Sequence, residues 1–155
     1  IKNAFTYVGV DILIQESVKL TIQMLDEPIP SSTYLIQESS LVALPSLRQS
    51  GLKFDLLLLD GDHNYHTVKQ ELEFIDDLTH DNSVIIIDDY NGKWSDRDLW
   101  YAERPGYEAN ELATKPVDTN KHGVKPAVDD WLEKNKHWKS QIPISGEPVV
   151  LTKQK

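Results

Sequence analysis

Residues 54–65, FDLLLLDGDHNY, and residues 83–90, SVIIIDDY, decide the fold of this 155-residue chain. Each stretch contains a short continuous apolar run, Leu56–Leu59 in the first and Val84–Ile87 in the second, and each run stops at an aspartate. Continuous apolar runs of this kind are typical of strands that are buried on both faces of a parallel sheet. The two stretches therefore predict a pair of parallel strands that each end in an acidic residue.

The segment between the two predicted strands has the spacing of an amphipathic helix. Its apolar residues Val68, Leu72, Ile75 and Leu78 recur at intervals of three and four. A strand, a helix and a second parallel strand form a right-handed crossover, which brings both strand ends to one edge of the sheet. In open α/β sheets ligands bind at that edge. The residues that we expect to converge there are Asp60, Asp62, His63, Asp88 and Asp89.

Four carboxylates and an imidazole at two strand ends predict a cation site. Like charges that crowd together repel each other, so a cation among them stabilises the cluster. Oxygen ligands suit a hard divalent ion such as Mg²⁺, Ca²⁺ or Mn²⁺. The alternative is a solvated acidic rim, and Asp60 taken alone is also a candidate cap for the following helix.

DGDHNY followed one helix later by IIIDDY resembles the pattern of class I S-adenosylmethionine-dependent methyltransferases. The similarity is closest to the metal-dependent O-methyltransferases, which include the macrocin and mycinamicin sugar enzymes and the catechol and caffeoyl-CoA enzymes. In that pattern an acid after strand four and two adjacent acidic or amide residues after strand five hold Mg²⁺, which binds two neighbouring oxygens of the acceptor. The resemblance assigns the metal to Asp60, Asp88 and Asp89.

The resemblance also assigns a general base, because in the sugar-modifying group a histidine follows the first acid by three residues, and His63 matches it. Nearby carboxylates make a histidine a better proton acceptor. The residues alone leave two other interpretations of His63 open, a helix-capping or structural histidine and a metal ligand.

A cofactor site for S-adenosylmethionine is implied in the same way. The predicted strand 4–12 corresponds to the family's second strand, whose terminal acid, here Asp11, binds the ribose hydroxyls. The third strand, Thr33–Gln37, is followed by Glu38 and Ser39, which stand where the family reaches the adenine. Asp11 as a helix cap and Glu38 as a solvent-facing loop acid are the alternatives. The resemblance places Asp60 beside the cofactor as well as the metal.

The family's first strand and its glycine-rich loop have no counterpart in the sequence. Gly9 is a lone glycine inside a predicted strand and cannot form such a turn. We therefore expect either a chain that is incomplete at its N-terminus or a non-catalytic methyltransferase-like domain that has lost cofactor binding. A phosphoacceptor receiver-type domain is a further rival, but there the acidic pair precedes the single acid in the chain.

Composition narrows the class of partner. The formal net charge is −9 and the pI is about 4.9, which argues against nucleic acid or an anionic membrane as a partner. The chain has no cysteine, so disulfides and thiolate metal sites are excluded. No apolar run is long enough to span a bilayer and no signal peptide is visible. We expect a cytoplasmic protein with a small-molecule substrate, and a homo-oligomer remains open.

The complete prediction is one α/β domain over residues 1–155, a Rossmann-like, doubly wound, mainly parallel sheet with an antiparallel C-terminal hairpin. Further helices are predicted at 14–26, 41–49 and 124–135. Residues 90–123 form a long aromatic-rich segment that is either a folded lid or a satellite hydrophobic cluster. The predicted activity is metal-dependent O-methylation of a sugar, polyol or phenol hydroxyl.

Overall fold

The computed structural model describes residues 6–24, 32–144 and 146–154, and within these ranges strands alternate with helices. The first half contains β1 (Thr6–Asp11), α1 (Glu16–Met24), β2 (Ser32–Gln37) and α2 (Ser40–Gln49). The middle contains β3 (Phe54–Leu59), α3 (Tyr65–Leu72), η1 (Asp76–Leu78) and β4 (Thr79–Ile87). The last part contains η2 (Tyr101–Glu103), α4 (Val124–Lys134), β5 (Trp138–Gln141) and β6 (Val149–Lys153).

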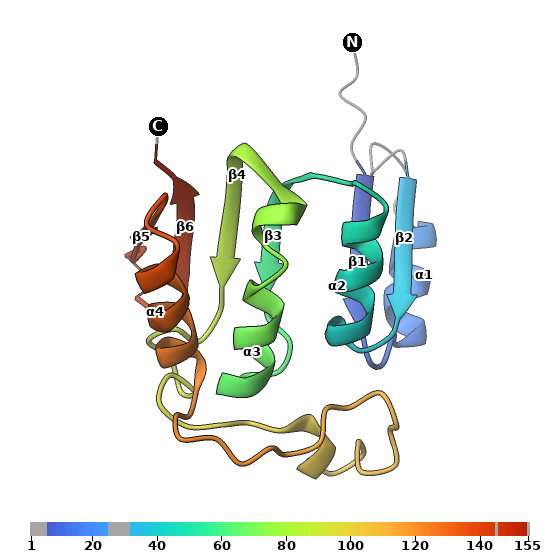
Figure 1. Ribbon diagram of the computed structural model, residues 1–155. Coiled ribbons are helices and arrows are strands. Elements are labelled where there is room, and N and C mark those ends of the chain that lie inside the picture. The colour runs from blue at the N-terminus through green and yellow to red at the C-terminus, as the bar shows by residue number, and fades with distance from the viewer. Residues whose placement is uncertain (1–5, 25–31, 145, 155) are drawn as a thin grey trace.

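The strands form two sheets. β1 pairs with β2 in parallel, and β3 pairs with β4 in parallel, so the predicted α/β class is confirmed. β6 lies antiparallel between β4 and β5, which also confirms the C-terminal antiparallel pair. We expected one central sheet, but no described ladder joins β1 to β3. Their unpaired edges face each other (Figure 1).

Helix packing connects the two sheets. α2 leaves the end of β2 and returns the chain to the start of β3, and on its way it contacts β1, α3 and η1. Its buried residues are Ala43 and Leu44, and Leu44 belongs to the main hydrophobic core. An ion pair of 2.7 Å between Arg48 Nε and Asp77 Oδ2 adds a contact to the turn η1.

The core lies between one face of the four-stranded sheet and the helices α3 and α4. Leu57, Ile85 and Leu151 point into it from three neighbouring strands and are at most 9% exposed. The opposite face carries Leu56 and Leu58, which are 59% and 61% exposed. In the described ranges α3 and α4 therefore cover one face of this sheet, as Figure 1 shows.

The crossover helix ends earlier than its apolar pattern predicts. α3 ends at Leu72, and β4 begins at Thr79 instead of Val84. Ile75 and Leu78 lie beyond the helix and are nevertheless fully buried. A turn of 3₁₀ helix keeps both side chains on the core side. The same apolar spacing therefore occurs first in an α-helix and then in a 3₁₀ turn.

Irregular pairing explains the early start of β4. Phe54 pairs with Thr79 but Leu56 already pairs with Val84, so extra residues of β4 bulge out of the ladder. The Ser83 hydroxyl donates to the Phe54 carbonyl over 2.6 Å, which holds the bulge against β3. Bulges of this kind are invisible to an apolar pattern because the extra residues are polar.

The 90–123 segment runs along the carboxyl ends of the parallel strands (Figure 1, yellow to orange). Leu99 N donates to the His63 carbonyl over 3.0 Å, and Asn110 Nδ2 donates to the Ile12 carbonyl over 3.0 Å. The segment is therefore anchored to the ends of both sheets. No helix within the described ranges is long and apolar enough to cross a membrane.

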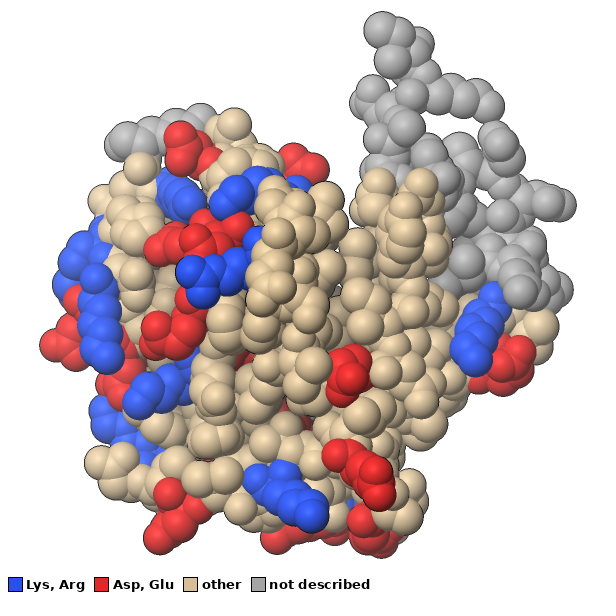
Figure 2. Space-filling view, turned by 45° about the vertical axis from the view of Figure 1, so that its right-hand side comes forward, with Lys and Arg blue, Asp and Glu red and all other residues tan. Residues whose placement is uncertain are grey.

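The surface on the side of the two-stranded sheet is largely uncharged (Figure 2). Tyr34 and Val42, from β2 and α2, are 57% and 54% exposed. The described part of this face therefore presents mainly uncharged and apolar side chains.

Candidate active site

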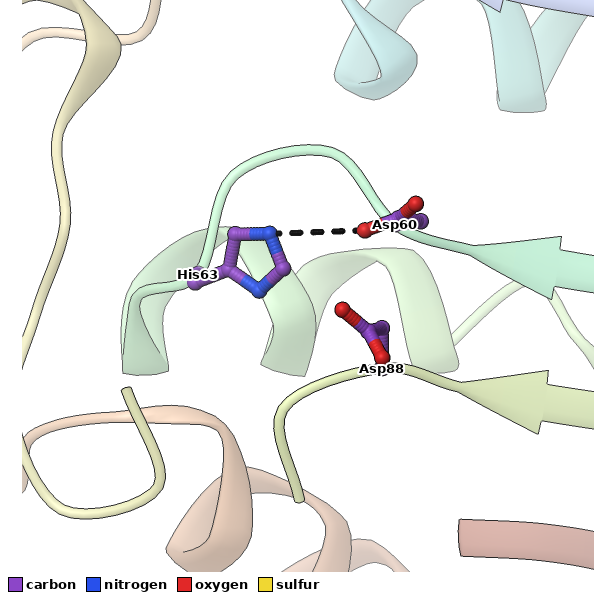
Figure 3. Close-up of side chains that lie close together, drawn as sticks. All are labelled: Asp60, His63 and Asp88. Atoms are coloured by element: carbon purple, nitrogen blue, oxygen red, sulfur yellow. Dashed lines mark ion pairs between the residues drawn. The ribbon is translucent and has the colours of Figure 1, made fainter. Parts of the chain in front are cut away.

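Asp60, His63 and Asp88 meet at the carboxyl ends of β3 and β4 (Figure 3). Asp60 directly follows β3 and Asp88 directly follows β4, so the parallel pairing of these strands places both at the same edge. One ligand atom from each of the three residues lies within 4.8 Å of the others. His63 Nε2 lies 3.6 Å from Asp60 Oδ1. The edge predicted from the two strand ends is therefore the edge at which they converge.

Asp89 lies on the other side of the His63 ring, with Oδ2 3.4 Å from Nδ1. Its φ of 55° is in the left-handed region, where aspartate is tolerated but most residues are strained. A Cβ at Gly92 would collide with the Asp89 carboxylate, so a larger residue there would displace this side chain. The glycine thus leaves room for the carboxylate beside the imidazole.

The neighbouring charges in the cluster shift the pKa of Asp60 in opposite directions. Burial, and after it the negative charge of Asp88, raises the pKa of Asp60, while the nearby His63 acts in the opposite direction. A hydrogen bond between the two carboxyl groups of Asp60 and Asp88 also raises this pKa. Two carboxylates this close favour either a shared proton or a cation between them.

The donor atoms fit a divalent cation. Two carboxylates suit a hard ion such as Mg²⁺, and an imidazole beside them also suits Mn²⁺ or Zn²⁺. The metal set expected from the resemblance was Asp60, Asp88 and Asp89, whereas the atoms that come closest belong to Asp60, His63 and Asp88. Asp89 is placed instead to hold the His63 ring, the usual role of a carboxylate behind a ligand or base.

The start of α3 shapes the loop that carries these residues. Asn64 is the N-cap, because its Oδ1 accepts from Thr67 N over 2.8 Å. The suggestion that Asp60 caps this helix is therefore wrong. Asn64 is fully buried, and its amide also donates to the Leu99 carbonyl over 3.3 Å. This capping leaves the side chains of Asp60 and His63 available to the cluster.

The Asp62 carboxylate turns away from the cluster. Its oxygens accept from Tyr101 N and from the Thr67 hydroxyl, each over 3.4 Å. Burial is the main cause that raises its pKa. We expected Asp62 to join the acidic cluster. It instead links the loop after β3 to the 90–123 segment.

The residues expected at the cofactor gather at the end of the two-stranded sheet. The Asp11 carbonyl accepts from Glu38 N over 3.0 Å, and Glu38 Oε1 accepts from Ser39 N over 2.9 Å. Asp11 Oδ1 accepts from Leu13 N over 2.8 Å, before α1 begins at Glu16. It closes a turn and does not cap the helix, so that alternative is wrong.

Comparison with known families gives a match over residues 3–90 to a family described as a methyltransferase domain. The match covers more than half of the chain. The chain belongs to this methyltransferase domain family. No curated protein matches the chain. The methyltransferase match contains the acidic cluster and the Asp11–Ser39 region, and it ends at Tyr90, where the aromatic segment begins.

Asp98, which follows the matched residues in the chain, is a structural residue that the sequence did not reveal. Its Oδ1 accepts from Tyr65 N over 2.9 Å and from Gly123 N over 2.7 Å, and its Oδ2 lies 2.7 Å from His122 Nδ1. It thereby joins the first residue of α3 to the residue before α4. The partners lie far away in the chain, so no local spacing could have indicated them.

The aromatic residues of the 90–123 segment include a buried and a half-exposed group. Tyr90 and Trp100 are buried. Tyr101 packs edge-on against Tyr107 with ring centroids 5.1 Å apart, and Arg104 lies 5.6 Å from the Tyr101 ring. Burial is the first cause that raises the pKa of Tyr101, and the charges of Asp60 and Asp62 contribute. The 90–123 segment thus contributes buried aromatic side chains and a half-exposed aromatic pair near the acids.

Proposed function

We propose that the chain is an S-adenosylmethionine-dependent methyltransferase that uses a divalent metal to O-methylate a small-molecule hydroxyl of the sugar, polyol or phenol type. The observation that carries this proposal is the convergence of Asp60, His63 and Asp88 in a methyltransferase domain. Carboxylates that crowd together at the ligand-binding edge of a parallel sheet can bind a cation, and the cation can bind an acceptor.

Asp60 and Asp88 are the proposed metal-holding residues, and Asp89, the third acid of the set expected from the resemblance, is proposed to orient His63. A divalent ion at this position would lower the pKa of an acceptor hydroxyl, as it does for water. The raised pKa of Asp60, which results from burial and from Asp88, supports a site that is completed by positive charge.

His63 is the proposed general base. Its Nδ1 faces Asp89, and a proton on that nitrogen would leave Nε2, on the Asp60 side, as the acceptor. The ring is 9% exposed, so it is held in place by its surroundings. A fixed imidazole with one nitrogen toward the acceptor supplies what proton abstraction requires.

The proposed cofactor residues are Asp11 for the ribose and Glu38 and Ser39 for the adenine. S-adenosylmethionine supplies the methyl group when it is bound. Their shared position at the end of the β1–β2 sheet supports this assignment. Asp60, at the end of β3, is the proposed residue between cofactor and acceptor.

Calorimetric titration of S-adenosylmethionine, with and without Mg²⁺, tests the proposal. We expect saturable binding, and methyl transfer to a surveyed hydroxyl acceptor that stops on chelation. Absence of cofactor binding under both conditions would favour a non-catalytic methyltransferase-like domain. The observation that favours this second candidate is the lack of a glycine-rich turn in the sequence.

A further inference from the structure

The segment from Leu99 to Asn110 is hydrogen-bonded at its two ends to different sheets. At its start, Leu99 N donates to the His63 carbonyl over 3.0 Å, and the Leu99 carbonyl accepts from Asn64 Nδ2 over 3.3 Å. At its end, Asn110 Nδ2 donates to the Ile12 carbonyl over 3.0 Å. The segment therefore extends from the loop after β3 to the turn after β1, a path that can be followed in Figure 1.

The Asn110 side chain uses both its acceptor and its donor. Its Oδ1 accepts from Leu112 N over 2.9 Å, which closes a turn of the kind that asparagine favours. Its backbone N donates to the Tyr107 carbonyl over 2.9 Å, and its own carbonyl accepts from Ala113 N over 3.1 Å. These local hydrogen bonds fix the orientation of the side chain, so that Nδ2 points to the Ile12 carbonyl.

The Ile12 carbonyl belongs to the turn that carries a proposed cofactor residue. Asp11 Oδ1 accepts from Leu13 N over 2.8 Å, so the residues on either side of Ile12 are bonded to each other. The Asp11 carbonyl accepts from Glu38 N over 3.0 Å, which ties the turn to the end of β2. A hydrogen bond to the Ile12 carbonyl therefore restrains the turn that presents the Asp11 carboxylate.

The connection matters because the two halves of the proposed site belong to different sheets. Among the described residues no ladder joins β1, which precedes the turn, to β3, which precedes the acidic cluster. Between the two anchors of the segment, Tyr101 and Tyr107 pack edge-on, and Tyr101 N donates to Asp62 Oδ1 over 3.4 Å. The 99–110 segment thus carries an aromatic pair from the acidic half of the site toward the cofactor half.

We propose that Asn110 is a positioning residue that holds the Asp11–Leu13 turn against the 99–110 segment, and thereby holds the cofactor half of the site beside the acidic half. The role of this turn in cofactor binding rests on the proposed function. Asparagine suits this position because one short side chain has both an acceptor for the local turn and a donor for the other sheet. An aspartate would keep the acceptor and lose the donor, because a carboxylate only accepts.

The test compares Asn110→Asp and Asn110→Ala with Glu111→Gln, a change at the exposed neighbouring residue. Amide hydrogen exchange of the cofactor-free protein, read by mass spectrometry, should become about fivefold faster over residues 12–15 in both Asn110 variants, the effect of one hydrogen bond. Over residues 111–113 it should become faster in Asn110→Ala alone, because aspartate still accepts from Leu112 N. Glu111→Gln should match the wild type in both regions. Wild-type rates over residues 12–15 in both Asn110 variants overturn the inference, whether or not the cofactor binds.

Cofactor affinity provides the second readout. Calorimetry should show that both Asn110 variants bind S-adenosylmethionine about fivefold more weakly than the wild type. Their Mg²⁺ affinity should stay the same, because the acidic cluster follows strands of the other sheet. Saturating cofactor should also slow exchange over residues 111–113 in the wild type but not in Asn110→Asp.

Two results of these titrations would contradict a positioning role. One is an equal cofactor affinity in the wild type and both Asn110 variants, and the other is a loss of Mg²⁺ affinity as large as the loss of cofactor affinity. A wild type that binds no cofactor would reject the proposed function, and exchange over residues 12–15 would then decide the role of Asn110.

Discussion

His63 has an aspartate beside each ring nitrogen, Asp60 at 3.6 Å and Asp89 at 3.4 Å. This arrangement makes the roles of base and metal ligand separable by mutation. Asp88→Asn keeps an oxygen but removes a charge, so we expect weaker metal binding and partial recovery of activity by added Mg²⁺. His63→Ala leaves the carboxylates in place, and Mg²⁺ should not rescue it. Activity measured against Mg²⁺ concentration checks both expectations.

The expected loss for His63→Ala is on the order of 10²–10⁴-fold, the usual contribution of a positioned base. Higher pH should restore part of that loss, because hydroxide can replace the imidazole. Wild-type turnover in His63→Ala would leave His63 with a structural role only. If Mg²⁺ instead rescues this variant, His63 is a metal ligand.

Asp11 provides a separate prediction for the cofactor half of the site. Asp11→Ala should weaken S-adenosylmethionine binding by about 1–3 kcal/mol, the cost of losing a hydrogen bond to a charged group. Calorimetry measures the change. Metal affinity should stay the same, because Asp11 belongs to the other sheet. An unchanged cofactor affinity removes Asp11 from the site.

Glu71, which is buried on α3, gives a prediction for stability, with a sign opposite to that of most acids. Its pKa is about 7 in the folded protein and about 4.5 in the unfolded chain, so folding favours the protonated form. Between these values the folded state binds the proton more strongly, and the free energy of unfolding falls as pH rises. The fall attributable to Glu71 is about 3 kcal/mol.

Glu71→Gln should lack this pH dependence. Urea unfolding at pH 5 and pH 8 would measure it, with Glu73→Gln as the exposed control. If wild type and Glu71→Gln lose equal stability between the two pH values, the carboxyl is not protonated in the folded state.

Among single residues, the sequence predicted the positions of those that directly follow a strand. Asp60 and Asp88 end apolar runs, and parallel pairing alone brings them together. Asp98 could not be predicted, because its partners Tyr65 and Gly123 become neighbours only when the long segment folds back. Asn64 was within reach, since an asparagine before a helical pattern is a usual cap.

Among the elements, η1 shows how one side chain can connect several. Asp76 accepts from Trp138 Nε1 over 2.9 Å and from His137 Nε2 over 3.0 Å, and Lys153 Nζ lies 3.7 Å away. These contacts tie the turn before β4 to β5 and β6. Burial, the largest contribution, raises the pKa of Asp76, but the hydrogen bonds from His137 and Trp138 bring it below its usual value.

Asp76→Ala should therefore lower the free energy of unfolding at neutral pH by about 1 kcal/mol, a value reduced because the carboxylate is partly exposed. A depressed carboxyl pKa contributes stability above the unfolded value, near 3.9, and the contribution disappears as pH falls through the lower folded value. Chemical unfolding at pH 7 and pH 3 measures both. Equal destabilisation at the two pH values would show that packing, and not charge, holds this contact.

Elements were predictable where a single backbone conformation explains the pattern. Strands β3 and β4 follow from their apolar runs. The end of α3 does not, because Ile75 and Leu78 remain buried at helical spacing after the helix has stopped. The core requires apolar side chains at this spacing, and a 3₁₀ turn presents Ile75 and Leu78 to the core as an α-helix would.

At the level of the whole molecule, the alternation of strands and helices was predictable, and the division into two sheets was not. The apolar pattern of a short stretch of sequence predicts which residues form a strand, but it does not predict with which other strand they pair. Among the described residues β1 pairs with β2 and β3 pairs with β4, and no ladder joins β1 to β3. Their relation depends on α2 and on the bond from Asn110 to Ile12, contacts between residues far apart in the chain.

The exposed face of β3 has a consequence for the behaviour of the protein in solution. Leu56 and Leu58 are 59% and 61% exposed on this face, and neighbouring exposed apolar side chains promote association between molecules. Asp55, whose side chain is 98% exposed, is a charged residue of the same strand that opposes such association. Light scattering at increasing protein concentration should show earlier aggregation for Asp55→Ala and later aggregation for Leu58→Lys.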